Sequence, residues 1–172
     1  MGKTELYIYN FLKSLSIYCP DQLNIENISR KSKIEVQYWD CSSESVHYKG
    51  HKIILLNNNL TYQQQWQEFG HELCHVLWHA GRQENISDSF CSYQEGQADN
   101  FAYHLCIPTF MLCRLKGVST YEVMNLFNVE YGFASKRLEM YRNKIIMKGV
   151  TTKCQKDMYG IVAETGGNWK WI

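Results

Sequence analysis

The sequence lacks the features of an exported or membrane-embedded protein. It contains no apolar run long enough to cross a bilayer, and its first residues show no secretory signal. Charge of one sign is also missing, because 18 Lys and Arg residues against 17 Asp and Glu residues give a net charge of +1. Such a balance provides no electrostatic basis for binding nucleic acid or an anionic membrane. We therefore expect a cytoplasmic protein with no membrane partner, for which DNA is not a favoured partner.

Disulfide and Cys-zinc frameworks are missing as well. The seven cysteines are an odd number, and no two of them form a C-x-x-C pair. In a chain without an export signal, this irregular spacing predicts free thiols in a reducing compartment. Only two prolines occur, and each of them, Pro20 and Pro108, marks the end of a predicted helical segment.

Hydrophobic periodicity predicts an α+β fold in which a short β-sheet precedes a mostly helical C-terminal part. The length of 172 residues fits one domain with a small appendage. The predicted elements are helices at 4–17 and 22–32, a strand at 33–39, a hairpin of 45–48 and 52–56 around Lys49-Gly50, a helix from Thr61 to a stop at Gly81, a polar loop at 81–92, a helix at 93–108, and helical segments at 110–115, 119–127 and 133–141.

The helix predicted after Thr61 contains His71-Glu72-Leu73-Cys74-His75, an H-E-x-x-H pattern. Residues four apart lie on one face of a helix, so both imidazoles point the same way and can share one metal ion. Glu72 projects about 100° around the helix from His71, where a carboxylate can act as a general base on water without being a ligand. This pattern is typical of a zinc hydrolase, and the alternative is a surface helix with two solvated histidines. The apolar residues of the segment recur on the opposite face, as Trp66, Phe69, Leu73, Val76 and Leu77.

A catalytic zinc site needs a third protein ligand and one open position. The extended metzincin pattern is absent, because it requires Gly at the position of Trp78 and His at the position of Gly81. Glu95 and Asp99 are four residues apart and share one face of the next predicted helix. We assign Glu95 as the third ligand and Asp99 as the hydrogen-bond partner of a ligand histidine. The alternative is an ordinary helix with an exposed Glu and Asp.

Three segments together resemble the ImmA/IrrE family of zinc metallopeptidases. They are KIILLNNNL at 52–60, FGHELCHVLWH at 69–79 and EGQADNFAYHLCIP at 95–108. The resemblance implies a small zincin-like domain of the gluzincin type, in which His71, His75 and Glu95 bind one zinc ion and Glu72 is the catalytic base. Such proteins occur in prophages and mobile elements. The family implies site-specific cleavage of a helix-turn-helix repressor, which makes the protein an anti-repressor, and some relatives are stress-response regulators. One departure is Cys74, where a small residue such as Gly is usual.

Two further roles are assigned by position. The donor that stabilises the transition state has three candidates that the sequence does not rank, namely Tyr93, His79 and His104. One strand segment is predicted either to bind extended substrate as an edge strand beside the metal or to pack as a core strand under the first metal-binding helix. The residues of this segment are Ile53, Ile54, Leu55 and Leu56.

We expect a zinc metallopeptidase domain at 1–112, a helical subdomain packed on it at 113–146 and a C-terminal tail at 147–172. Segment 119–142 resembles a helix-turn-helix, but its basic residues are offset by Glu139, so a packed helical pair is favoured over a DNA reader. The main alternative to a peptidase is a non-catalytic zinc-containing regulator that binds a repressor or DNA without cutting it. A peptidase with broad substrates is the third possibility.

Overall fold

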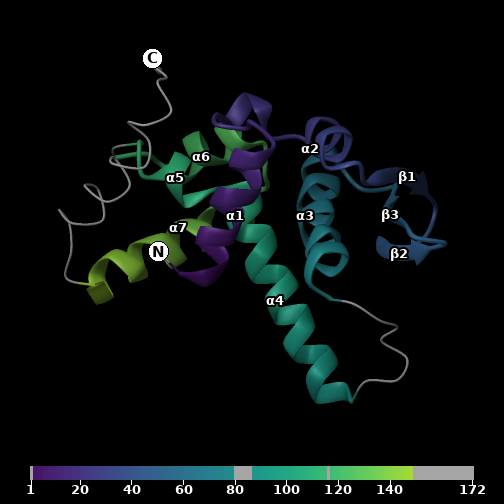
Figure 1. Cartoon of the computed structure of the whole chain (residues 1–172). Coiled ribbons are helices and arrows are strands. Elements are labelled where there is room, and N and C mark those ends of the chain that lie inside the picture. Colours follow the sequence, from purple (N-terminus) through teal and green to yellow (C-terminus); the bar gives the residue numbers. More distant parts are fainter. Residues whose placement is uncertain (1, 80–86, 116, 149–172) are drawn as a thin grey trace.

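Helix α3 lies between a small sheet and the long helix α4 in the computed structural model, which describes residues 2–79, 87–115 and 117–148 (Figure 1). The elements are α1 (Lys3–Ser14), the 3-10 turn η1 (Pro20–Gln22), α2 (Ile25–Ser32), β1 (Glu35–Trp39), β2 (Glu44–Tyr48), β3 (His51–Asn57), α3 (Tyr62–Trp78), α4 (Asp88–Cys106), α5 (Thr109–Leu112), α6 (Thr120–Phe127) and α7 (Tyr131–Lys148). Helices α1, α5, α6 and α7 lie on the other side of α4 from the sheet, whereas α2 lies on the sheet side, next to β1 (Figure 1). The predicted α+β fold is confirmed.

β3 is the central strand of the three-stranded sheet, whose order is β1-β3-β2. β1 pairs with it in parallel, and β2 pairs with it antiparallel. The predicted hairpin is present and turns through Lys49 and Gly50, where φ is 48° and 83°. Positive φ at both central residues is what a two-residue hairpin loop of the mirror-image type requires, and glycine adopts it without strain.

The prediction that Ile53, Ile54, Leu55 and Leu56 form an edge strand is wrong. Both sides of this segment are paired, with β1 along one side and β2 along the other. An alternating pattern indicates which face of a strand is buried, but it cannot indicate a parallel partner from farther back in the chain. The prediction of a core strand holds instead, because Ile54 and Leu56 are fully buried and β3 contacts α3. Among the described residues, the edges of the sheet are β1 and β2.

α3 begins with a capping box. The Thr61 hydroxyl accepts a hydrogen bond from the Gln64 backbone N–H, and the Gln64 side chain accepts one from the Thr61 N–H. The predicted apolar stripe is the buried face of the helix, with Trp66, Phe69 and Leu73 at most 1% exposed. Burial of this stripe on one side fixes the rotation of α3, so the residues of the H-E-x-x-H pattern face α4.

α4 is longer than the sequence indicates, because it begins at Asp88. The predicted polar loop at 81–92 is therefore wrong for residues 88–92, while residues 81–86 and the helix stop predicted at Gly81 lie outside the described residues. The first turns of α4 are polar and exposed, so hydrophobic periodicity carries no signal there. Asp88 in the first turn favours a helix start through its charge at the positive end of the helix dipole.

A buried polar network joins α1, α4 and α7. Arg137 of α7 is 1% exposed, and its Nε donates to the carbonyls of Tyr103 at 3.2 Å and Ile107 at 3.1 Å, at the C-terminal end of α4. A terminal guanidinium nitrogen donates to Thr109 Oγ1 at 2.7 Å, and Thr109 donates to Glu5 Oε1 at 2.7 Å. These bonds satisfy a charge that burial would otherwise make costly, and they hold the α6–α7 pair against the rest of the chain.

Three basic side chains of α7 are engaged within the chain, whereas Arg142 is exposed. Lys144 pairs with Glu5, Lys136 lies 3.1 Å from Glu139, and Arg137 is buried. The α6–α7 pair turns at Asn128, which adopts a left-handed φ of 50°. This arrangement agrees with a packed helical pair rather than a DNA reader. The tail predicted at 147–172 lies outside the described residues from position 149 onward.

Candidate metal centre

Two histidines of α3 and one glutamate of α4 bring their ligand atoms together. The Nε2 atoms of His71 and His75 are 3.2 Å apart, and Glu95 places Oε2 3.0 Å from His71 Nε2 and Oε1 3.5 Å from His75 Nε2. One ligand atom from each residue lies within 4.8 Å of the other two. A tetrahedral zinc ion with bonds of about 2.0–2.1 Å separates neighbouring ligands by about 3.3 Å, so this donor set fits zinc.

Asp99 lies beside His71 on the side away from the cluster. Its Oδ1 is 2.9 Å from His71 Nδ1. A carboxylate at this position favours the tautomer with the proton on Nδ1, which leaves the Nε2 lone pair directed at the cluster. The i,i+4 spacing on α4 therefore brings both predicted carboxylates to His71, one at each ring nitrogen.

His75 is 8% exposed and is the more deeply buried of the two histidines. Its pKa is lowered to about 4, mainly by burial; Glu95 and Asp99 oppose this shift, while the neighbouring His71 and His79 contribute to it. The imidazole is therefore neutral at neutral pH, which is the form that binds a metal ion.

Glu72 is 7% exposed and does not belong to the ligand cluster. Burial raises its pKa to about 7, with the negative charges of Glu68 and Glu95 adding to the increase, while His71 and a hydrogen bond from Ser45 oppose it. Ser45 belongs to β2 and is not among the site residues predicted from the sequence. Its only sequence signal is a position in the hairpin before α3, which does not indicate which residue it contacts.

Cys74, the departure from the family pattern, is fully buried in the core. Burial raises the pKa of its thiol to about 12, and the nearby charge of Glu95 adds to the increase. A neutral buried thiol is a small apolar side chain and a poor metal ligand. Cys74 therefore packs in the core and contributes no ligand atom to the cluster.

Helices α3 and α4, which carry the cluster, lie within a segment of the sequence that matches a known protein family. A model of the peptidase M78 family, described as the IrrE N-terminal-like domain, matches residues 30–139. The chain belongs to this family. Its fold is that of a zincin-like M78 domain, so the resemblance to ImmA/IrrE peptidases is confirmed, and membership supports a peptidase acting on protein.

Two proteins of Bacillus subtilis (strain 168) are similar to this M78 chain. The phage-like element PBSX protein XkdA is 37% identical over 149 residues, which cover 84% of this chain and 75% of XkdA. The uncharacterized protein YqaB is 32% identical over 146 residues, which cover 82% of this chain and 85% of YqaB. Within the described part of the M78 chain, no helix combines the length and apolarity needed to span a bilayer.

The three candidate donors of the M78 chain lie in different surroundings. His79 Nδ1 is 2.9 Å from His75 Nδ1, so it adjoins a residue of the cluster. Tyr93 is 59% exposed, and its hydroxyl accepts a hydrogen bond from Gln97, a residue without a role in the sequence analysis. His104 is directed elsewhere, because its Nδ1 donates to the Asn100 carbonyl at 2.9 Å and its Nε2 is 3.7 Å from Glu5. The structure therefore does not bring His104 to the cluster.

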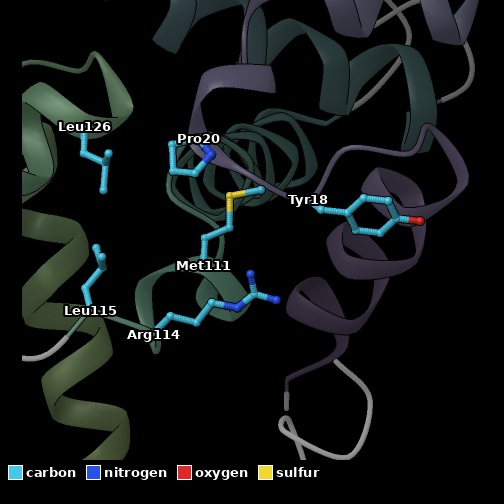
Figure 2. Close-up of a pocket in the computed structure, with 6 residues that line it drawn as sticks. All are labelled: Tyr18, Pro20, Met111, Arg114, Leu115 and Leu126. Carbon is cyan, nitrogen blue, oxygen red and sulfur yellow. The ribbon is translucent and has the colours of Figure 1, made fainter. Parts of the chain in front are cut away.

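A pocket of the M78 chain lies outside the metal centre. It opens between the segment after α1, the region of α5 and helix α6, where Met111 extends toward Pro20 (Figure 2). None of the cluster residues lines it. The lining residues are Tyr18, Pro20, Met111, Arg114, Leu115 and Leu126.

Proposed function

We propose that this M78 chain is a cytoplasmic zinc metalloendopeptidase that cleaves a helix-turn-helix repressor of a prophage or mobile element at one site. The observation that carries the proposal is the convergence of His71, His75 and Glu95, with Glu72 buried next to them. Three protein ligands leave one coordination position open, as in catalytic zinc sites.

Each residue of the site has a chemical role in peptide hydrolysis. His71, His75 and Glu95 would hold the ion, which when bound supplies a Lewis acid for the scissile carbonyl and lowers the pKa of water. Glu72 takes a proton from the attacking water and delivers it to the leaving amine. Burial raises the pKa of Glu72 to about 7, which suits a group that must accept a proton and then return it near neutral pH.

β2, rather than β3, is the strand suited to bind an extended substrate. Its outer edge has no strand partner among the described residues, and β2 contacts α3. Ser45 of this strand hydrogen-bonds Glu72. A peptide that adds to this edge through main-chain hydrogen bonds would therefore run next to the general base.

The repressor substrate is proposed on two grounds. The three sequence segments resemble the ImmA/IrrE peptidases, whose family implies this substrate, and the similar protein XkdA is named as part of a phage-like element. Cleavage of such a repressor would relieve repression. A DNA-binding role receives less support, because Lys136, Arg137 and Lys144 of α7 are buried or paired within the chain.

Incubation of the purified chain with a helix-turn-helix repressor encoded beside its gene tests the proposal. We expect discrete repressor fragments that require zinc, disappear when a chelator is added and are absent with the Glu72→Gln variant. A repressor that binds the zinc-loaded protein and stays intact would support the non-catalytic regulator instead. Degradation of casein at a comparable rate would indicate a peptidase with broad substrates.

A further inference from the structure

We propose that His79 and Gln97 are positioning residues of the metal centre, which hold His75 through a chain of hydrogen bonds that ends at Tyr93. The inference deepens the proposed function, since it rests on His75 being a metal ligand. It concerns a different set of contacts from the three ligands and Asp99. None of these three residues is needed to complete the donor set.

The chain of hydrogen bonds is continuous from the cluster to the surface. His75 Nδ1 lies 2.9 Å from His79 Nδ1, and the two rings are 4.8 Å apart at an angle of 63°. His79 Nε2 lies 3.2 Å from Gln97 Oε1. The Gln97 amide nitrogen donates to the Tyr93 hydroxyl oxygen at 3.0 Å. Each member of the chain thus contacts the next through a polar atom.

The hydrogen-bonding chemistry of these side chains determines which atom donates in each bond of the chain. His75 turns Nε2 toward His71 and Glu95, so a metal-binding His75 must keep its lone pair on Nε2 and its proton on Nδ1. His75 Nδ1–H then donates to His79 Nδ1. His79 consequently carries its own proton on Nε2, which donates to the carbonyl oxygen of Gln97. The amide group of Gln97 is satisfied on both sides, because it accepts from His79 and donates to Tyr93.

The two ligand histidines therefore have different partners at Nδ1. His71 faces the carboxylate of Asp99, whereas His75 faces a neutral imidazole. His79 follows the last helical residue of α3 and has an extended backbone, with φ of −106° and ψ of 102°, so helix geometry does not hold its ring. Gln97 supplies that support from α4. The chain thus ties the end of α3 to α4 at the point where His75 needs a fixed orientation.

Tyr93 is the outer end of this chain rather than a donor to the reacting carbonyl. Tyr93 and Gln97 each lie two residues from Glu95, which places them about 200° around α4 from the ligand by the helical period. Tyr93 is 59% exposed. Its hydroxyl oxygen accepts a hydrogen bond from Gln97, so Tyr93 supports Gln97 at the exposed end of the chain of hydrogen bonds.

Zinc affinity of the full chain, measured by competition with a chromogenic chelator, tests the proposal. We expect His79→Phe to weaken zinc binding by about 10–100-fold, the usual effect of losing an outer partner of a ligand histidine, and Gln97→Leu to weaken it by a smaller factor. His79→Asn should restore most of the affinity, because an amide oxygen can accept from His75 Nδ1–H. Gln65→Leu is the matched control on α3, since it removes only a 3.1 Å bond to the Asn57 carbonyl.

Nuclear magnetic resonance of the zinc-loaded protein with labelled histidines gives a second readout. We expect His79 to show a proton on Nε2 and none on Nδ1, and Gln97→Leu to broaden or shift its resonances. Unchanged zinc affinity in both His79→Phe and Gln97→Leu would overturn the proposal, as would a proton on Nδ1 of His79. An equal loss in Gln65→Leu would also overturn it, because the effect would then be general.

The outcome is separable from that of the proposed function. If the wild-type chain binds zinc and cleaves no repressor, the peptidase proposal fails while the ranking of zinc affinities still decides the role of His79. If the chain cleaves its repressor and His79→Phe binds zinc as tightly as the wild type, the peptidase proposal stands and the positioning role is excluded.

Discussion

Gly70 of α3 lies directly against Ala102 of α4. A Cβ at position 70 would come within 3.2 Å of the Ala102 Cα and 3.3 Å of its Cβ, closer than these groups normally approach. Neither atom can rotate away, because they belong to the backbone and the first side-chain carbon of a packed helix. His71 is the next residue, so this contact sets the distance between the two helices that carry the cluster.

Gly70→Ala is therefore expected to separate α3 from α4 and to weaken zinc binding, with a loss of affinity of roughly tenfold, similar to other changes in ligand support. Overpacking should cost about 1–3 kcal/mol of stability, offset in part by about 1 kcal/mol of helix propensity. Chelator competition and urea denaturation measure the two effects. Gly96→Ala is the control, because nothing lies within 4 Å of a Cβ there. Equal zinc affinity in both variants would contradict the role of Gly70.

The ligand cluster could be predicted from the sequence because helical geometry is local. His71 and His75 lie one turn apart, and Glu95 and Asp99 repeat that spacing on the next helix, so each pair shares a face before any tertiary contact is known. The position of β3 in the sheet could not be predicted in this way. β3 pairs with β1, although β2 lies between the two strands in the sequence. No residue in 53–56 indicates this long-range pairing.

The residues that could not be predicted from the sequence are those that contact the site from a different helix or strand. Ser45 reaches Glu72 from the sheet, and Gln97 reaches His79 from α4. Neither residue type is a metal ligand or a usual base, and neither spacing is periodic with the motif. The same limit applies to His104, because its position on α4, the helix that carries Glu95, does not indicate that its side chain faces Glu5 of α1.

Glu72→Gln should stabilise the metal-free protein at high pH. Burial raises the pKa of Glu72 from 4.5 to about 7, so the folded state holds a proton that the unfolded state has already released. The wild type therefore loses stability as pH rises from the unfolded value through about 7, by about 3 kcal/mol for a shift of this size. Glutamine cannot ionise and escapes this loss.

Urea denaturation in the presence of a chelator, at pH 5 and pH 8, measures this effect. The advantage of Glu72→Gln over the wild type should be small at the lower pH and largest at the higher pH. An advantage of the same size at both pH values would show that ionisation of Glu72 is not its cause.

Glu95→Ala should lower the zinc content of the purified protein. The variant removes both carboxylate oxygens from the cluster and leaves two imidazole ligands. Asp99→Asn should have a smaller effect, of about 10–100-fold on affinity, because an amide oxygen still accepts from His71 Nδ1 but carries no charge. Elemental analysis after dialysis against dilute chelator ranks the variants. Unchanged stoichiometry in Glu95→Ala would move the third ligand to another residue.

Glu5→Gln should destabilise the chain by about 2–3 kcal/mol, because it removes the charge that offsets Lys144 at a buried site. Burial alone would raise the pKa of Glu5, but hydrogen bonds from His104, Lys144, Gly2 and Thr109 outweigh it and hold the pKa well below 4.5.

A depressed pKa stabilises the fold above pH 4.5 and loses that contribution as the pH falls below it. The deficit of Glu5→Gln, measured by urea denaturation, should therefore be full at pH 7 and shrink in acid. Lys136→Gln is the control, because its ion pair with Glu139 is exposed and should contribute at most about 0.5 kcal/mol. A deficit of Glu5→Gln that stays constant down to pH 3 would assign the loss to packing instead of charge.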